Sequence, residues 1–235
     1  MSIGKFGTMG GLIAGYHLND NANDFSGNER NGIPTDIAYD PATGILGPGA
    51  KFNGSSSKIV LPSSLWTPMS DANFSVAAVV QLPESAPTTQ PIFGRSWRSF
   101  DGYYYGYCFL LYANSFAYYR NPGFSVSYYV SANFGFESGK RYLVGLTYNH
   151  ITTGYGYIYC YPLFKSKIKG VGAAALTKND VEIYGPGDQG LCVGANLRNV
   201  SNQYSSITMN EFLVFNKELP QKWYRDYAAY LRGFK

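Results

Sequence analysis

The 235-residue chain is 45% hydrophobic, 17% aromatic and only 14% charged, and its formal net charge is +4. This length suits a single β-sandwich domain. A domain of this size buries enough surface to form a core without disulfides or metal ions. There is no dense basic stripe and no apolar run near the roughly 18 residues of a membrane span, so we expect no nucleic-acid partner and no membrane insertion.

The N-terminal arm, residues 1–10, lacks the apolar segment that secretory signals carry. We therefore expect a protein made in the cytoplasm without a signal peptide. No internal repeat or linker is visible, so residues 1–235 are predicted to form one domain.

A strand and an unusually polar turn open the domain. Residues 12–18 contain enough alternating apolar side chains to predict a strand. Residues 19–32 are rich in Asn, Asp, Ser and Gly, which hydrogen-bond to their own backbone and tolerate left-handed conformations. We predict that this segment forms a turn.

Short apolar segments then recur between Gly, Asn and Pro turns. They predict two short strands within residues 50–61, and further strands at 74–82, 92–94, 116–119, 124–130, 141–149, 155–161, 181–184, 191–195 and 207–215. Segment 74–82 is apolar on both faces, as expected of a central strand. Strands at such short spacing predict an all-β sandwich.

Residues 220–232 are predicted to form a helix. Pro220 suits the first helical turn. An apolar stripe follows at spacings of i, i+4, i+7 and i+8, formed by Trp223, Tyr227, Tyr230 and Leu231. We expect this stripe to pack across the edge or end of a sheet.

Three motifs occur in order: DFSGNERNG at residues 24–32, FNGSSSKIVLP at 52–62 and NEFLVFNKELP at 210–220. They resemble the opening turn, an early segment and the closing strand of the LamG-like, concanavalin A-like lectin/glucanase superfamily (LamG_3 type). The resemblance implies a concanavalin A-like jelly-roll sandwich of two antiparallel sheets with a short C-terminal helix. We expect residues 12–18 and 207–215 to lie side by side.

Oxygen ligands of the type that calcium prefers gather in the polar turn. The candidate metal ligands are Asp20, Asp24, Asn28 and Glu211. Glu211 is predicted to share a strand face with Ile207, Met209, Leu213 and Phe215, where an isolated charge would be costly. Relatives often bind calcium near these ends, so the resemblance makes a structural Ca²⁺ a candidate, although no cofactor is expected to be required. The alternative is a turn bonded to itself and a Glu211 paired with Tyr or Arg.

Tyrosine is the compositional outlier, with 22 copies. Two alternating runs place their phenols on one strand face each: Tyr103, Tyr105 and Tyr107, and then Tyr155, Tyr157, Tyr159 and Tyr161. Phenols suit sites that are apolar at one end and wet at the other. These faces are candidate sites for a glycan or a protein partner. The alternative is cross-strand packing that stabilises the sheet.

No catalytic constellation is visible in the sequence. The superfamily's hydrolases carry an E-x-D-x-x-E strand, which does not occur here, and glycoside hydrolysis needs paired carboxylates. His17 and His150 are isolated, and no nucleophile has a plausible histidine base. Cys108, Cys160 and Cys192 lie in apolar surroundings and are expected to be buried thiols. We predict that the protein is not an enzyme.

Two functions remain. The first is a virion-associated decoration, tail or fibre protein with an adhesive role, because sandwiches of this superfamily occur in phage particles and the chain is poor in charge and rich in tyrosine. Its partners would be other proteins of an oligomeric assembly, a cell-surface glycan, or both, at the virion surface. The alternative is a stand-alone carbohydrate-binding lectin module that is not part of a virion.

Overall fold

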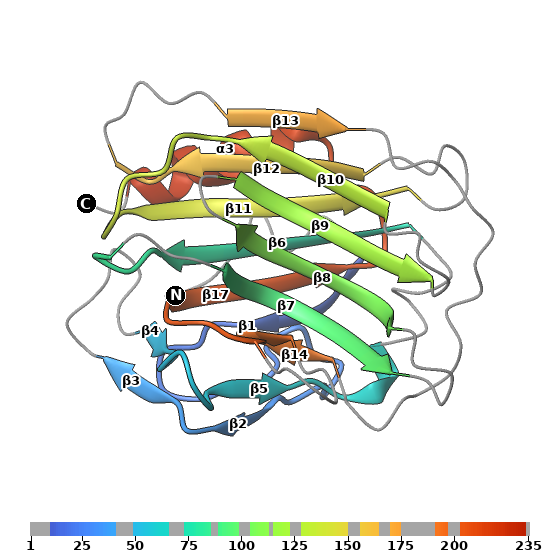
Figure 1. The fold of residues 1–235 in the computed structure, drawn as a ribbon, viewed down its shortest axis with the longest axis vertical. Helices are drawn as coiled ribbons and strands as arrows, with labels where there is room; N and C mark the ends of the chain where they lie inside the picture. The colour runs from blue at the N-terminus through green and yellow to red at the C-terminus, as the bar shows by residue number, and fades with distance from the viewer. Residues whose placement is uncertain are drawn as a thin grey trace.

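The computed structural model describes residues 10–40, 49–65, 73–85, 89–98, 104–112, 115–122, 128–149, 156–164, 170–174, 191–196 and 203–233. Within this part of the chain, two large antiparallel sheets stack face to face, and helix α3 (Gln221–Arg232) lies outside one of them (Figure 1). The arrangement confirms the predicted concanavalin A-like sandwich with a C-terminal helix.

Sheet A contains eight of the described strands. Their order is β13-β12-β11-β6-β17-β4-β3, and β1 also pairs with β17. The bounds are β1 Leu12–Tyr16, β3 Ala38–Asp40, β4 Gly49–Lys51, β6 Phe74–Gln81, β11 Arg141–Tyr148, β12 Gly156–Pro162, β13 Gly170–Ala174 and β17 Thr208–Phe215.

Sheet B contains seven of the described strands, in the order β10-β9-β8-β7-β14-β5-β2. The bounds are β2 Ile33–Thr35, β5 Lys58–Val60, β7 Thr89–Arg98, β8 Tyr104–Tyr112, β9 Ser115–Pro122, β10 Tyr128–Asn133 and β14 Cys192–Val193. A small hairpin-like pair joins β15 (Ala195–Asn196) to β16 (Gln203–Tyr204), and Ser63–Leu65 form a single 3-10 turn. The strand predicted at 181–184 lies outside the described residues.

The main core lies between the two sheets. It is built largely from phenylalanine and branched aliphatic side chains that face inward from both sheets, including Phe74, Phe93, Phe109, Phe116 and Phe212. Strand β6 contributes to both sides of sheet A, as its doubly apolar sequence predicts. The three cysteines, all among the described residues, are buried thiols outside any disulfide, and burial raises the pKa of the Cys160 thiol well above its ordinary value.

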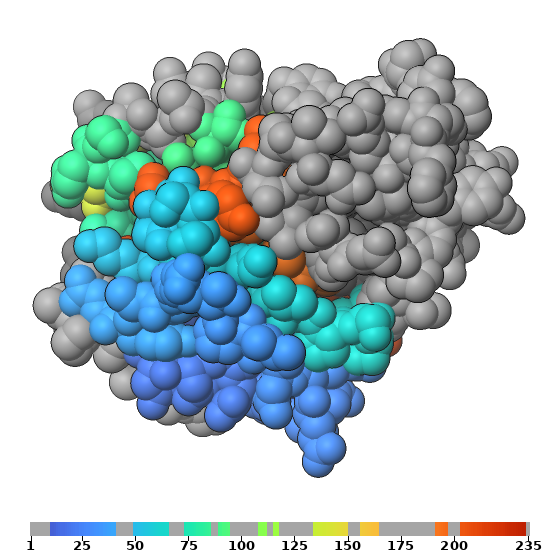
Figure 2. Space-filling model, turned by 60° about the horizontal axis from the view of Figure 1, so that its bottom comes forward, coloured from blue at the N-terminus to red at the C-terminus, as the bar shows by residue number. Residues whose placement is uncertain are grey.

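The two ends of the described chain meet in sheet A. Strand β1 runs antiparallel to β17, with Leu12 opposite Phe215 and Tyr16 opposite Phe212. The expected neighbourhood of residues 12–18 and 207–215 is therefore confirmed. The first strand ends at Tyr16, two residues earlier than predicted, and Leu18 adopts a left-handed backbone with a φ of 46°. In Figure 2, residues 10–40 (blue) and 49–65 (cyan) cover this end of the sandwich together.

A β-bulge at Asn210 corrects one sequence prediction. Met209 pairs with Val80, but Glu211 pairs with the next residue, Val79, so the bulge reverses the alternation of β17. Ile207 and Met209 therefore face the core between the sheets, whereas Glu211 faces the helix. The predicted face shared with Ile207 and Met209 is wrong for this reason, whereas the face shared with Leu213 and Phe215 is confirmed, because both lie in the cluster under α3.

Helix α3 lies on the outer face of sheet A, where it forms a second apolar cluster. Its Trp223, Tyr227 and Leu231 are buried as predicted, and Tyr224 is buried as well. The partners come from β6, β11, β12 and β17, so the helix covers the face of the sheet and not its edge or end as expected. No helix in the described part of the chain is long and apolar enough to cross a membrane.

Candidate functional site

The turn after β1 is organised by the Asp24 carboxylate. It accepts hydrogen bonds from the backbone N–H groups of Gly15 (2.9 Å), Ser26 (2.9 Å) and Arg30 (3.0 Å). The Ser26 hydroxyl donates a fourth bond at 2.8 Å. Four donors therefore surround one negative charge, and they fix the turn against the sheet.

The same turn is also tied to the carbonyl of Ile13 in β1. Asn28 Nδ2 donates to it at 3.2 Å and Arg30 Nη1 donates at 2.6 Å. Gly27 and Glu29 take left-handed backbones, which the tight path requires. Much of the polar character of residues 24–31 is thus used within the turn, as the self-bonded alternative proposes.

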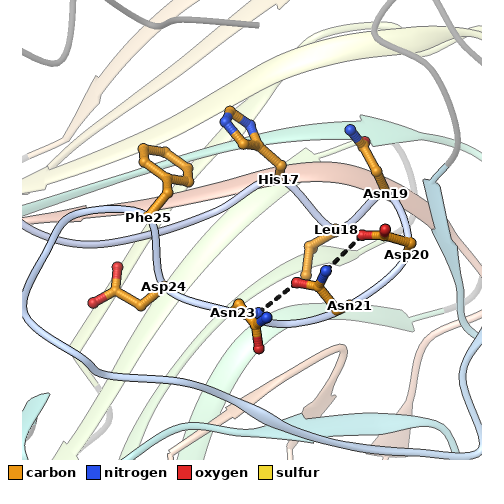
Figure 3. A pocket seen from close by; sticks show the side chains of 8 residues that line it. All are labelled: His17, Leu18, Asn19, Asp20, Asn21, Asn23, Asp24 and Phe25. Atoms are coloured by element: carbon orange, nitrogen blue, oxygen red, sulfur yellow. Dashed lines mark hydrogen bonds between the residues drawn. The ribbon is translucent and has the colours of Figure 1, made fainter.

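A pocket of about 240 Å³ opens next to this turn (Figure 3). Its lining is His17, Leu18, Asn19, Asp20, Asn21, Asn23, Asp24 and Phe25. The rings of His17 and Phe25 are stacked, with centroids 4.2 Å apart and planes inclined by 17°. Phe25 fits because Gly15 lies beneath it, where an added Cβ would approach the ring to 2.5 Å.

The opposite side of the pocket carries amides and a carboxylate. Asn21 donates from Nδ2 to Asp20 at 2.6 Å, and its Oδ1 accepts from the backbone N–H of Asn23 at 2.8 Å (Figure 3). Asp20, Asn21 and Asn23 are all exposed. Burial, followed by the charge of Asp20, raises the pKa of the neighbouring Tyr39 phenol. The pocket thus combines stacked rings with exposed hydrogen-bonding groups.

Glu211 lies behind the pocket with only 3% of its surface exposed. The Tyr227 hydroxyl of α3 donates to its Oε2, and His17 Nδ1 lies 3.4 Å from its Oε1. Burial and the charge of Glu211 raise the pKa of Tyr227 well above its ordinary value. The buried carboxylate is therefore held from one side by α3 and positions His17 on the other.

Sequence analysis does not reveal the role of His17, because the sequence pattern indicates no partner for its side chain. A signal was available in the expected pairing of the two chain ends, which brings the residue after β1 close to Glu211 on β17. The exact partner depends on the bulge at Asn210, and no sequence pattern marks that bulge.

The four candidate calcium ligands do not converge in the structure. Both oxygens of Asp24 accept protein donors, and its side chain points away from Asp20 (Figure 3). Asn28 is bonded to Ile13 and Ser26, and Glu211 is engaged by Tyr227 and His17. The described residues contain no group of three or more His, Cys, Asp or Glu side chains suited to a metal ion. The geometry gives no support to a site built from this set, and calcium binding stays a prediction.

The tyrosines of β12 lie on the face of sheet A that α3 covers. Tyr159 is 5% exposed and stacks on Tyr224, with ring centroids 4.4 Å apart. Burial raises the pKa of Tyr159 to about 12. Tyr157 and Tyr161 are half-buried beside the same cluster.

For the other four predicted tyrosines, the structure describes no side chain. Tyr105 and Tyr107 lie on β8, but only their backbone is described. Tyr103 and Tyr155 lie outside the described residues. A binding role for either tyrosine face stays a prediction, and at Tyr159 it would compete with the helix.

Comparison with known proteins shows similarity of fold only. No family model and no curated protein matches the chain. Among solved structures, the chain is similar to botulinum neurotoxin type C, which depends on two ganglioside molecules to enter cells. The TM-score is 0.63 at 16% identity, and the match covers 100% of this chain and 53% of the toxin chain.

Two further structures show the same likeness. The binding domain of botulinum neurotoxin DC with SialylT has a TM-score of 0.62 at 14% identity, over 96% of this chain and 52% of the other. The same binding domain with rat synaptotagmin II has a TM-score of 0.61 at 13% identity, over 94% and 52%. The chain spans about half the length of these structures. The chain thus shares the two-sheet sandwich fold of these binding domains.

Proposed function

We propose that this protein is a non-catalytic, carbohydrate-binding module with a lectin-like sandwich. The observation that carries the proposal is the likeness of nearly the whole chain to receptor-binding domains whose proteins interact with gangliosides and SialylT. The pocket at residues 17–25 adds local support, because amides and carboxylates match sugar hydroxyls and an aromatic ring suits an apolar sugar face.

The protein contacts of Glu211 and Asp24 support a non-catalytic role. Glycoside hydrolysis needs two carboxyl groups on either side of one bond. Glu211 is buried against Tyr227 and His17, and Asp24 is enclosed by four donors. Neither is arranged as an acid and base pair across the pocket.

A virion-associated adhesive role is the second candidate. It is supported by the tyrosine-rich, charge-poor composition, and it would place other proteins of an assembly, as well as glycans, among the partners. A protein partner is also named for one of the similar binding domains, which is in complex with rat synaptotagmin II. The likeness to receptor-binding domains favours the stand-alone lectin module over the virion role.

One experiment separates the two candidates. The purified chain is applied to a glycan array, and its mass in solution is measured by size-exclusion chromatography with light scattering. The lectin module predicts a stable small species with reproducible array signals. Self-assembly into large particles without any array signal would contradict it and would favour the structural role.

A further inference from the structure

We infer that the pocket lined by residues 17–25 takes an uncharged sugar residue and disfavours sialic acid and other acidic sugars. The inference rests on the proposed carbohydrate-binding function, and it names the site and the class of ligand. It also separates this chain from the similar toxin domain seen with SialylT.

The size and chemistry of the pocket suit one sugar ring. Its volume of about 240 Å³ lies below the roughly 300–1,000 Å³ of sites for drug-sized ligands. Sugar hydroxyls both donate and accept hydrogen bonds, and the exposed amide of Asn23 in the lining offers both functions. The stacked His17 and Phe25 rings line the pocket and supply its apolar side, against which the C–H groups of a sugar can pack.

The charges of the lining residues decide against an acidic ligand. Asp20 is exposed at the pocket, and Asp24 adds a second carboxylate to the lining. No lysine or arginine is among the lining residues that the structure describes. A sugar carboxylate would therefore approach a like charge without the cation that usually pairs with it.

The nearby cationic groups are already engaged by the protein. His17 lines the pocket, but its Nδ1 faces the buried carboxylate of Glu211. The Arg30 guanidinium is not part of the pocket lining and donates to the Ile13 carbonyl at 2.6 Å. An acidic sugar would have to draw one of these groups away from its partner, whereas an uncharged sugar needs no such rearrangement.

The test uses paired probes. The full chain is titrated with uncharged glycans that end in galactose, glucose, mannose or N-acetylhexosamine, and with the sialylated or uronic-acid counterpart of each. Within each pair of probes that binds, we expect the uncharged glycan to bind about tenfold more tightly than the acidic one at low salt. Repulsion between two like charges near a protein surface lowers affinity by roughly that factor. Raising the salt should narrow the difference, since screening weakens it.

Three variants locate the effect. Asp20→Asn keeps the acceptor for Asn21 and removes the charge, so it should improve binding of the acidic member by several-fold. Glu29→Gln removes an exposed carboxylate that does not line the pocket and should change nothing. Asn23→Ala removes an exposed amide from the lining, and it should weaken the uncharged glycan by roughly fivefold, the value of about one hydrogen bond.

Each outcome decides something different. Equal or tighter binding of the acidic member by the unmodified chain overturns the ligand class and leaves carbohydrate binding standing. If glycan affinity is unchanged in both Asp20→Asn and Asn23→Ala, the pocket is not the binding site. If the panel contains no binder at all, the proposed function fails, and this inference fails with it.

Discussion

Stacked aromatic side chains occur both under α3 and in the turn after β1, and the protein uses them differently. Under α3, Tyr159 stacks on Tyr224 and is almost completely buried. After β1, His17 stacks on Phe25 beside exposed amides and an open pocket. The same kind of contact stabilises the fold in one region and lines a pocket in the other. The difference lies in whether another element covers the stack, which tyrosine content alone does not reveal.

The covered region should be the more sensitive to mutation. Tyr224 fills the space above Gly145, where a Cβ would lie 2.1 Å from its ring, and its hydroxyl lies 3.1 Å from Thr147 Oγ1. We expect Tyr224→Ala to lower the free energy of unfolding by roughly 3–5 kcal/mol, as for other buried aromatic truncations. Urea denaturation followed by circular dichroism measures this change.

Tyr230→Ala is the matched control for the covered region, because Tyr230 lies on the same helix but is only half-buried. Its cost should be clearly smaller. Equal losses for the two variants would mean that the Tyr224 contact is not what holds α3 on sheet A.

The stability of the turn that forms the pocket should depend on the charge of Asp24 and not on apolar packing. Asp24→Asn replaces an acceptor of four hydrogen bonds by a side chain with one acceptor and one donor group. We expect a loss of about 1.5–3 kcal/mol in unfolding free energy, the range for hydrogen bonds to charged groups. Asp36→Asn, at an exposed position, should stay within about 0.5 kcal/mol. If both variants unfold alike, Asp24 does not organise the turn.

The pH dependence of stability should also separate the two regions. Burial raises the pKa of Tyr159 from 10.0 to about 12, so the folded state keeps this phenol neutral after the unfolded state has lost its proton. The contribution is fully present below pH 10 and is lost as the pH rises toward 12. Between pH 9 and 11 the loss should be roughly 1 kcal/mol.

Tyr159→Phe should remove this contribution and flatten the alkaline decline by the same amount. Denaturant titrations of both proteins at pH 9 and 11 give the comparison. An unchanged decline in the variant would show that Tyr159 is not shielded by α3 in solution.

The smallest effect is expected for calcium. Because Asp24 and Glu211 are engaged by protein donors, we expect any rise in melting temperature in calcium over chelator to be small. A site at 100 times its dissociation constant would add about 2.7 kcal/mol. A rise of that size with calcium would therefore support the predicted metal site at this end of the sandwich.

The sequence predicts the sandwich well because its signals are local or lie in long motifs. Alternation identifies strand 74–82, the helical stripe identifies α3, and the two terminal motifs place the chain ends together. The contact between His17 and Glu211 is different, because it depends on cross-strand register and on a bulge at Asn210. The cover over Tyr159 is likewise invisible in a strand's own alternation, which gives two faces but not what lies on them.

The central claim is that the open end at residues 17–25 binds sugar while the face under α3 is closed. A crystal structure of the chain with the uncharged glycan that binds most tightly tests this directly. We expect a sugar ring in the pocket, beside the stacked His17 and Phe25 rings and within hydrogen-bonding distance of Asn23. A sugar bound on the tyrosines of β12 with α3 displaced, or at any other surface with the pocket empty, would contradict it.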